Sequence, residues 1–95
     1  MELEGLKVLV TGGSRGVGDA TTIAFAKKGC DVAMNYLHSV NKAKEVVEEI
    51  EDIGRRAIAA KADVSNFQDC EEMVRQVIKD LGRIDILVNN AGVFP

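Results

Sequence analysis

The stretch of sequence that decides the fold is Thr11-Gly12-Gly13-Ser14-Arg15-Gly16-Val17-Gly18. It follows the apolar run Leu6–Thr11, which predicts a buried strand. It leads into Val17–Lys28, whose apolar spacing predicts a helix that ends at Gly29. The sequence therefore predicts a glycine-rich turn between the end of a strand and the start of a helix.

The glycines of this turn have separate physical tasks. Gly12 permits a tight turn, Gly16 lets the backbone approach a pyrophosphate, and Gly18 lets the helix pack closely on a sheet. Free N–H groups and the positive dipole at the start of the helix would then hold the phosphates. The pattern favours dinucleotide binding over its alternative, a glycine-rich turn that holds no ligand.

The rest of the chain repeats the alternation of strand and helix. Apolar runs bounded by turn residues predict strands at Asp31–Tyr36, within Arg56–Asp63 and at Ile84–Val88. Helical spacing predicts two more helices, which end at Gly54 and Gly82. The residues expected to face the core are Val17, Ala20, Ile23 and Ala24 in the first helix, Ala43, Val46, Val47, Ile50 and Ile53 in the second, and Phe67, Cys70, Met73, Val74, Val77, Ile78 and Leu81 in the third.

This rhythm predicts an α/β fold with a Rossmann-type parallel sheet. Right-handed crossovers and near-continuous apolar strands indicate a sheet buried on both faces, with strand order 3-2-1-4. The chain reverses direction between the third and fourth strands, which creates a topological switch point beside the first strand, where ligands bind. At the start of the third helix, Ser65 with Gln68 three residues later predicts a capping box.

Composition narrows the function classes. The chain has 12 basic and 15 acidic residues and a net charge of −3, without a basic stripe, which argues against nucleic acid as a partner. Cys30, Cys70 and His38 are too few and too widely spaced for a zinc site, so both cysteines are expected to be buried free thiols. No apolar run approaches the ~20 residues that span a bilayer. The start, Met1–Glu4, lacks the features of a secretion signal. We therefore expect no membrane partner, no bound metal and a cytoplasmic location.

Three motifs in order carry a resemblance to a known family. The glycine turn has the spacing G-x-x-x-G-x-G, without the Gly-Lys-Ser/Thr of a P-loop. It is followed by Asp63-Val64 after the third strand and by Asn89-Asn90-Ala91-Gly92 after the fourth. This set resembles the short-chain dehydrogenase/reductase family. The Asn-Tyr after the second strand and A-I-A-A-K-A-D-V in the third are similar to 3-oxoacyl-carrier-protein reductases and bacterial sugar dehydrogenases.

The resemblance implies roles for matching residues only. Residues 1–95 would form the dinucleotide-binding half-domain of a doubly wound fold. Asp63 would accept a hydrogen bond from the adenine amino group, or cap the helix near Ser65, or do both. Val64 would line the adenine pocket, and Asn89 would hold the central strands together. The predicted cofactor-binding residues are Gly12, Ser14, Arg15, Gly16, Val17, Gly18, Asn35, Leu37, Asp63, Val64, Asn90, Ala91 and Gly92.

The end of the second strand indicates which nicotinamide cofactor is bound. Enzymes that use NAD commonly place an acid there, but this chain has Asn35, Tyr36 and Leu37. Asp31 begins that strand and should lie at the opposite edge of the sheet. Arg15 occupies the turn, where members that prefer NADP similarly carry a basic residue. Similar relatives often have arginine in place of Leu37. His38 and Ser39 would substitute in part for that arginine. The sequence favours NADP, with NAD as the alternative.

The family's catalytic serine and Tyr-x-x-x-Lys lie downstream of the last strand and are absent here. Tyr36 is the only tyrosine and is followed four residues later by Val40. Two hypotheses follow. The chain is the cofactor-binding portion of an oxidoreductase that moves hydride between cofactor and a carbonyl or alcohol, inactive by itself and part of a homo-oligomeric dimer or tetramer when complete. Alternatively, it is a standalone non-catalytic module that binds a nucleotide or a protein. Its apolar fourth strand would form a sheet edge, so we also expect loose packing or self-association.

Overall fold

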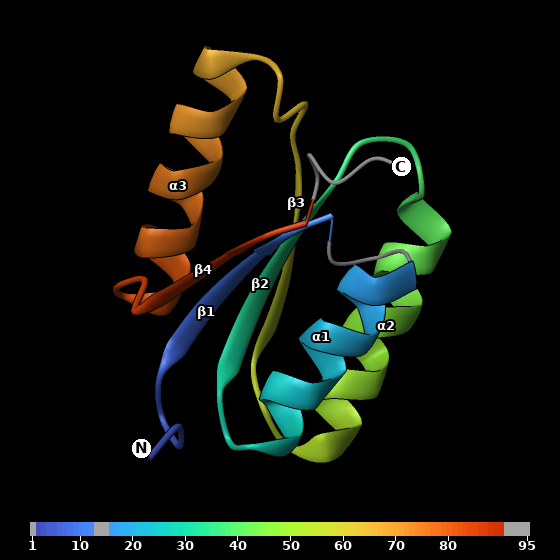
Figure 1. Ribbon diagram of the computed structural model, residues 1–95, viewed down its shortest axis with the longest axis vertical. Coiled ribbons are helices and arrows are strands. Elements are labelled where there is room, and N and C mark those ends of the chain that lie inside the picture. Colours follow the sequence, from blue (N-terminus) through green and yellow to red (C-terminus); the bar gives the residue numbers. More distant parts are fainter. Residues whose placement is uncertain (1, 13–15, 91–95) are drawn as a thin grey trace.

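The structure, a computed structural model, describes residues 2–12 and 16–90. Strands and helices alternate along it as the sequence predicts (Figure 1). In chain order, the elements are β1 (Lys7–Thr11), α1 (Gly16–Lys27), β2 (Asp31–Tyr36), α2 (Val40–Ile53), β3 (Ala57–Lys61), α3 (Phe67–Leu81) and β4 (Ile86–Asn89).

The four strands form one parallel sheet in the order β3-β2-β1-β4, which confirms the predicted fold class and topology. In its register, Leu9 of β1 lies beside Ala33 of β2 and Leu87 of β4. Since all strands run the same way, their carboxyl ends lie along one edge of the sheet. β4 begins two residues later than predicted, at Ile86 rather than Ile84.

Helices cover both faces of the sheet unequally. α1 and α2 pack on one face and α3 packs on the other (Figure 1). Successive side chains of a strand point to opposite faces, so Val8 and Val10 join the core under α1 and α2, whereas Leu9 joins the core under α3. Met73, Val77 and Leu81 are the α3 side chains buried in that second core. Two helices therefore bury one face, while within the described residues a single helix covers the other.

The predicted apolar stripes of α1 and α3 are too wide. In α1 the residues Ala20 and Ala24 are exposed, and Thr22 and Ala26 are buried instead. In α3 the buried residues are Met73, Val77 and Leu81, whereas Phe67 is 77% exposed. Val74 and Ile78 are also exposed. α3 packs mainly on β3 and β2, so only residues four apart on its inner side reach the sheet.

Two local predictions are also corrected. The cap of α3 is Asn66, whose side-chain oxygen accepts from the backbone N–H of Asp69 at 3.0 Å. Ser65 is not the cap, because its hydroxyl donates to Asp63. Of the two free thiols, Cys30 is fully buried, whereas Cys70 is only half-buried.

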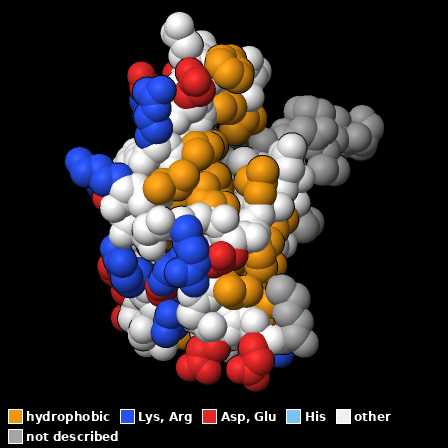
Figure 2. Space-filling view, turned by 90° about the vertical axis from the view of Figure 1, so that its left-hand side faces the viewer, with side chains coloured by type: hydrophobic (Ala, Val, Ile, Leu, Met, Phe, Trp, Pro, Cys, Tyr) orange, Lys and Arg blue, Asp and Glu red, His pale blue; other side chains and the backbone are white. Residues whose placement is uncertain are grey.

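The face that carries α3 is rich in exposed hydrophobic side chains. Figure 2 shows them as a band that runs along this side of the molecule, with charged side chains mainly to its left. The exposed large hydrophobic residues of α3, its preceding loop and β4 are Val64, Phe67, Val74, Ile78 and Leu87. This surface continues into a hollow between α3 and β4, which is described below.

Candidate nucleotide-binding site

The candidate site lies along the carboxyl edge of the sheet. From β1 the chain crosses to β2 and β3 on one side and returns to β4 on the other, so the switch point lies between β1 and β4. Gly12 leaves β1 at this point with φ +68°. Such a backbone conformation favours glycine because a side chain would be strained there. Residues 13–15 of the turn lie outside the described part of the chain.

Asn35 lies next to Gly12 with its side chain buried. It is 4% exposed. Its side-chain oxygen accepts from the backbone N–H of Gly12, and its side-chain nitrogen donates to the backbone oxygen of Ala62 at 3.1 Å. Both ends of the amide are therefore hydrogen-bonded inside the protein. The sequence pattern predicts that Asn35 faces the cofactor and does not indicate these two contacts.

Thr11 joins β1 to β4 at the same edge. Its hydroxyl donates to the side-chain oxygen of Asn89 at 2.9 Å and accepts from the backbone N–H of Asn90 at 3.1 Å. Thr11 and Asn89 are also register partners. Asn89 thus forms the link between the central strands that the resemblance implies for it, and it places Asn90 directly beside the end of β1.

Asp63 follows β3 and faces the same edge. Its Oδ1 accepts from both the hydroxyl and the backbone N–H of Ser65, at 2.6 and 2.9 Å. The hydroxyl bond, and then the backbone bond, hold the pKa of Asp63 below its ordinary value, with a further contribution from His38. Asp63 is therefore ionised at neutral pH. Since a carboxylate offers about four acceptor sites, it can still accept from a ligand.

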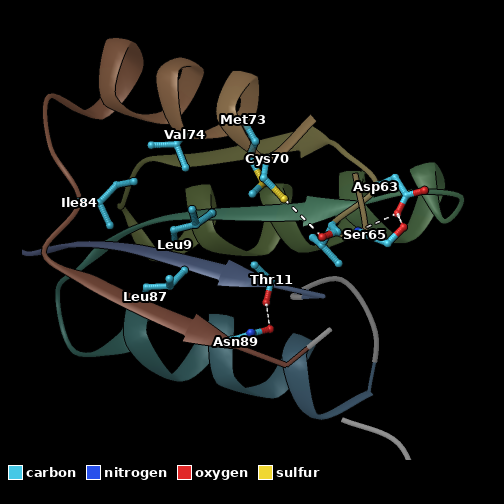
Figure 3. Close-up of a pocket in the computed structure, with 11 residues that line it drawn as sticks. Leu9, Thr11, Asp63, Ser65, Cys70, Met73, Val74, Ile84, Leu87 and Asn89 are labelled. Atoms are coloured by element: carbon cyan, nitrogen blue, oxygen red, sulfur yellow. Dashed lines mark hydrogen bonds between the residues drawn. The ribbon is translucent and has the colours of Figure 1, made fainter. Parts of the chain in front are cut away.

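A cavity of about 830 Å³ opens beside these residues, between α3 and β4. In Figure 3 its polar side chains gather at the end near the strand termini, where Asp63 and Ser65 lie on one side and Thr11 and Asn89 on the other. The rest of the lining is apolar, formed by Leu9, Val64, Cys70, Met73, Val74, Ile84 and Leu87. We call this cavity the α3–β4 groove. Its polar end suits a flat apolar ring that carries a hydrogen-bond donor on its rim.

The structure brings most of the described site residues to this edge. Gly12, Asn35, Asp63 and Asn90 lie at the ends of four neighbouring strands. The described part also includes the exposed Leu37 after β2, Val64 in the groove, and Gly16, Val17 and Gly18 at the start of α1. The predicted residues outside the described part of the chain are Ser14, Arg15, Ala91 and Gly92.

Asp31 lies at the opposite edge, as expected. It begins β2, and its carboxylate accepts from Lys7 and from the backbone N–H of Arg56. An acid at the amino end of β2 cannot reach a ligand at the carboxyl edge, so Asp31 belongs to the structural core.

Comparison with known proteins identifies the family. The model of the short chain dehydrogenase family matches residues 6–95. The chain belongs to the short-chain dehydrogenase/reductase family. The resemblance inferred from the three motifs is thereby confirmed.

Two curated relatives of this dehydrogenase-family chain match the resemblance that the sequence indicated. The chain is 47% identical over 93 residues to an L-rhamnose 1-dehydrogenase (NAD(P)(+)) of Sphingomonas sp. (strain SKA58). The aligned residues cover 98% of this chain and 37% of that protein. It is also 44% identical over 85 residues to a 3-oxoacyl-[acyl-carrier-protein] reductase of Staphylococcus epidermidis. Here the aligned residues cover 90% of this chain and 35% of that protein. The chain therefore spans little more than a third of the length of each of these two relatives.

Two further similarities concern length and fold. The short-chain dehydrogenase/reductase homolog YusS of Bacillus subtilis (strain 168) is 45% identical over 85 residues, which cover 90% of this chain and 78% of YusS. A solved structure of a short chain dehydrogenase from Burkholderia cenocepacia J2315 in complex with NADP has a TM-score of 0.94 and 46% identity, covering 100% of this chain and 39% of that one.

In residues 2–12 and 16–90, no group of three or more His, Cys, Asp or Glu side chains is arranged to hold a metal ion. None of the helices within those ranges is both long and apolar enough to cross a membrane.

Proposed function

We propose that residues 1–95 form the dinucleotide-binding half-domain of an oxidoreductase that transfers hydride between a nicotinamide cofactor and a carbonyl or alcohol. The observation that carries this proposal is the meeting of Gly12, Asp63 and Asn90 at the carboxyl edge of the sheet, beside the polar end of the α3–β4 groove. Family membership and the NADP bound by the similar Burkholderia structure support it.

Each part of the edge would hold one part of the cofactor. Backbone N–H groups of the glycine turn and the start of α1 would bind the pyrophosphate. Asp63 would accept from the adenine amino group, and Val64 would pack against the ring. Asn90, together with Ala91 and Gly92, would pass beside the adenine-side ribose.

The end of β2 favours NADP over NAD. It offers Leu37 where an enzyme selective for NAD commonly has an acid, so no carboxylate at this end of β2 would repel a 2′-phosphate. Arg15 in the turn would form charge-assisted hydrogen bonds to that phosphate. The L-rhamnose dehydrogenase is named for both cofactors, so NAD stays the second choice.

The catalytic step would require residues beyond this sequence. The family's serine and its tyrosine–lysine pair have no counterpart among the 95 residues, so we infer that this chain binds cofactor without turning over substrate. The complete protein would form a homo-oligomer. The free thiols of Cys30 and Cys70 support a reducing compartment, which we propose is the cytoplasm.

A second candidate function is a standalone non-catalytic module that binds a nucleotide or a partner protein. The specific observation in its favour is YusS, a curated relative of which this chain covers 78%. A family member whose length this chain covers to more than three quarters supports this second candidate. Both candidates share the same nucleotide site and differ only in catalysis.

Titration of the chain with NADPH and NADH tests the proposal. We expect tighter binding of NADPH, and we expect Arg15→Ala to weaken NADPH about tenfold or more while leaving NADH unchanged, because a hydrogen bond to a charged group contributes roughly 1.5–3 kcal/mol. Arg75→Ala, which removes an exposed arginine of α3, is the matched control. Tighter binding of NADH would contradict the preference for NADP, and carbonyl-dependent oxidation of NADPH by the 95-residue chain would contradict the inferred lack of turnover.

A further inference from the structure

Asn35 joins three segments of the chain at the centre of the carboxyl edge. Its side chain extends from β2 to Gly12, where the glycine turn begins, and to Ala62, the residue before Asp63. The side chain is buried, at 4% exposure. One amide group therefore connects the proposed pyrophosphate site to the proposed adenine site.

The chemistry of the two contacts requires an amide. Gly12 presents a donor, its backbone N–H, and Ala62 presents an acceptor, its backbone oxygen. Only a side chain that accepts at one end and donates at the other satisfies both, and asparagine does so with a short, stiff side chain. An aliphatic residue of similar size would leave a buried donor and a buried acceptor unpaired.

The orientation of the amide is determined by the same two partners. A flipped amide would direct its N–H groups at the Gly12 N–H and its oxygen at the Ala62 oxygen, so both contacts would be repulsive. Because both ends are engaged with backbone, Asn35 holds the start of the glycine turn at a set distance from the end of β3. A fully satisfied buried polar group of this kind rigidifies its surroundings.

We propose that Asn35 is a positioning residue that aligns the pyrophosphate site with the adenine site, so that one dinucleotide fills both. It acts through Gly12 and Ala62 and does not itself contact the cofactor. This inference rests on the proposed function, because it assigns those two sites to the two parts of the cofactor. It replaces the expectation that the Asn35 side chain binds the cofactor directly.

The test compares a whole dinucleotide with its parts. In Asn35→Leu, binding of NADPH should weaken about tenfold or more, equivalent to roughly 1.4 kcal/mol. Binding of adenosine alone and of inorganic pyrophosphate alone should change less than about threefold, because each fills a single site and needs no alignment. Calorimetric titration of all three ligands measures the difference.

A control separates alignment from general stability. Val32→Ala removes buried methyl groups from the same strand without touching Gly12 or Ala62, so it should lower the melting temperature and leave the ratio of NADPH to fragment affinity unchanged. If Asn35→Leu does not fold, Asn35→Thr provides the same comparison, since threonine suits a strand and its hydroxyl is too short to bridge both partners.

The possible outcomes are distinguishable. A folded Asn35→Leu that binds NADPH as tightly as the unmodified chain would overturn the inference alone. Equal weakening of all three ligands would also overturn it, because Asn35 would then only maintain the fold. If the unmodified chain bound no NADPH, the proposed function itself would fail and this inference with it.

Discussion

Asp31 shows how a single residue is committed to the fold. Its side chain is 5% exposed and forms ion pairs with Lys7 and, at 3.1 Å, with Arg55. It also accepts a hydrogen bond from the backbone N–H of Arg56 at 3.0 Å. Burial opposes its ionisation, but the bonds from Lys7 and Arg56 and the charge of Arg55 outweigh burial, so the pKa of Asp31 lies below its ordinary value. These contacts connect the starts of β1, β2 and β3.

We predict that Asp31 stabilises the protein at neutral pH and loses this effect in acid. A carboxyl whose pKa is lower in the folded state stabilises the fold above its ordinary pKa, here 3.8, and loses that contribution as the pH falls through the folded value. Asp31→Asn should therefore lower the free energy of unfolding by about 2–3 kcal/mol at pH 7, and the difference from the unmodified chain should narrow below about pH 4.

Urea titrations at several pH values measure this effect. Asp52→Asn, at an exposed position of α2, is the matched control and should change stability little at any pH. A constant difference between Asp31→Asn and the unmodified chain from pH 7 to pH 2 would contradict the assigned ion pairs.

At the scale of the elements, the start of α3 illustrates how closely related cap patterns compete. Ser65 and Asn66 are both good cap residues, and either could begin the helix. Asp63 accepts hydrogen bonds from both the hydroxyl and the backbone N–H of Ser65. Asn66 therefore takes the cap position, where its side chain accepts a hydrogen bond from the backbone N–H of Asp69. The loop that carries Asp63 into the site thus also determines where α3 begins.

We predict that the Asn66 cap contributes to stability, whereas Gln68, the second residue of the capping box predicted from the sequence, does not. Asn66→Ala removes the acceptor for the Asp69 N–H and should cost about 1 kcal/mol. Gln68→Ala should be nearly neutral, since the capping box that would require Gln68 does not form. Chemical denaturation of both variants measures the difference. A larger loss in Gln68→Ala than in Asn66→Ala would restore the capping box and contradict the observed cap.

At the scale of the whole molecule, the two faces of the sheet are covered unequally. α1 and α2 bury one face, and α3 covers part of the other, so the α3–β4 groove opens beside a strand that pairs only with β1 among the described residues. Leu87 of β4 is 62% exposed. An apolar edge strand of this kind is a template for pairing with another chain, and exposed apolar surface favours association.

We predict that the 95-residue chain self-associates through β4 and the groove. Leu87→Lys, which places a charge on the exposed strand, should shift the chain towards monomer in sedimentation velocity over a range of concentrations. Ile53→Lys is the matched control, because Ile53 is 37% exposed but lies on α2, across the sheet from the groove. A sharp, concentration-independent melt of a monomeric unmodified chain would disprove self-association and favour the standalone module.

Sequence alone determined the order of elements and the strand order, and it predicted which strand ends form the candidate site. Turn residues and apolar periodicity are local, and right-handed parallel crossovers allow few ways to assemble such a chain. Because all strands are parallel, residues placed after each strand necessarily meet at one edge. That is why Gly12, Asp63 and Asn90 could be assigned to one site from motifs that are far apart in the chain.

Only the tertiary structure decided which side chains are buried and what they contact. The stripe of α3 shows which side of the helix can be buried, but the sheet beneath it reaches Met73 and Val77 and leaves Phe67 in solvent. Asn35 lies at a strand end, as a ligand-binding residue would, yet its amide is hydrogen-bonded to the backbone of Gly12 and Ala62, the residues that follow β1 and β3. Burial and hydrogen bonding depend on the partner that folding brings close, and a local pattern does not contain that partner.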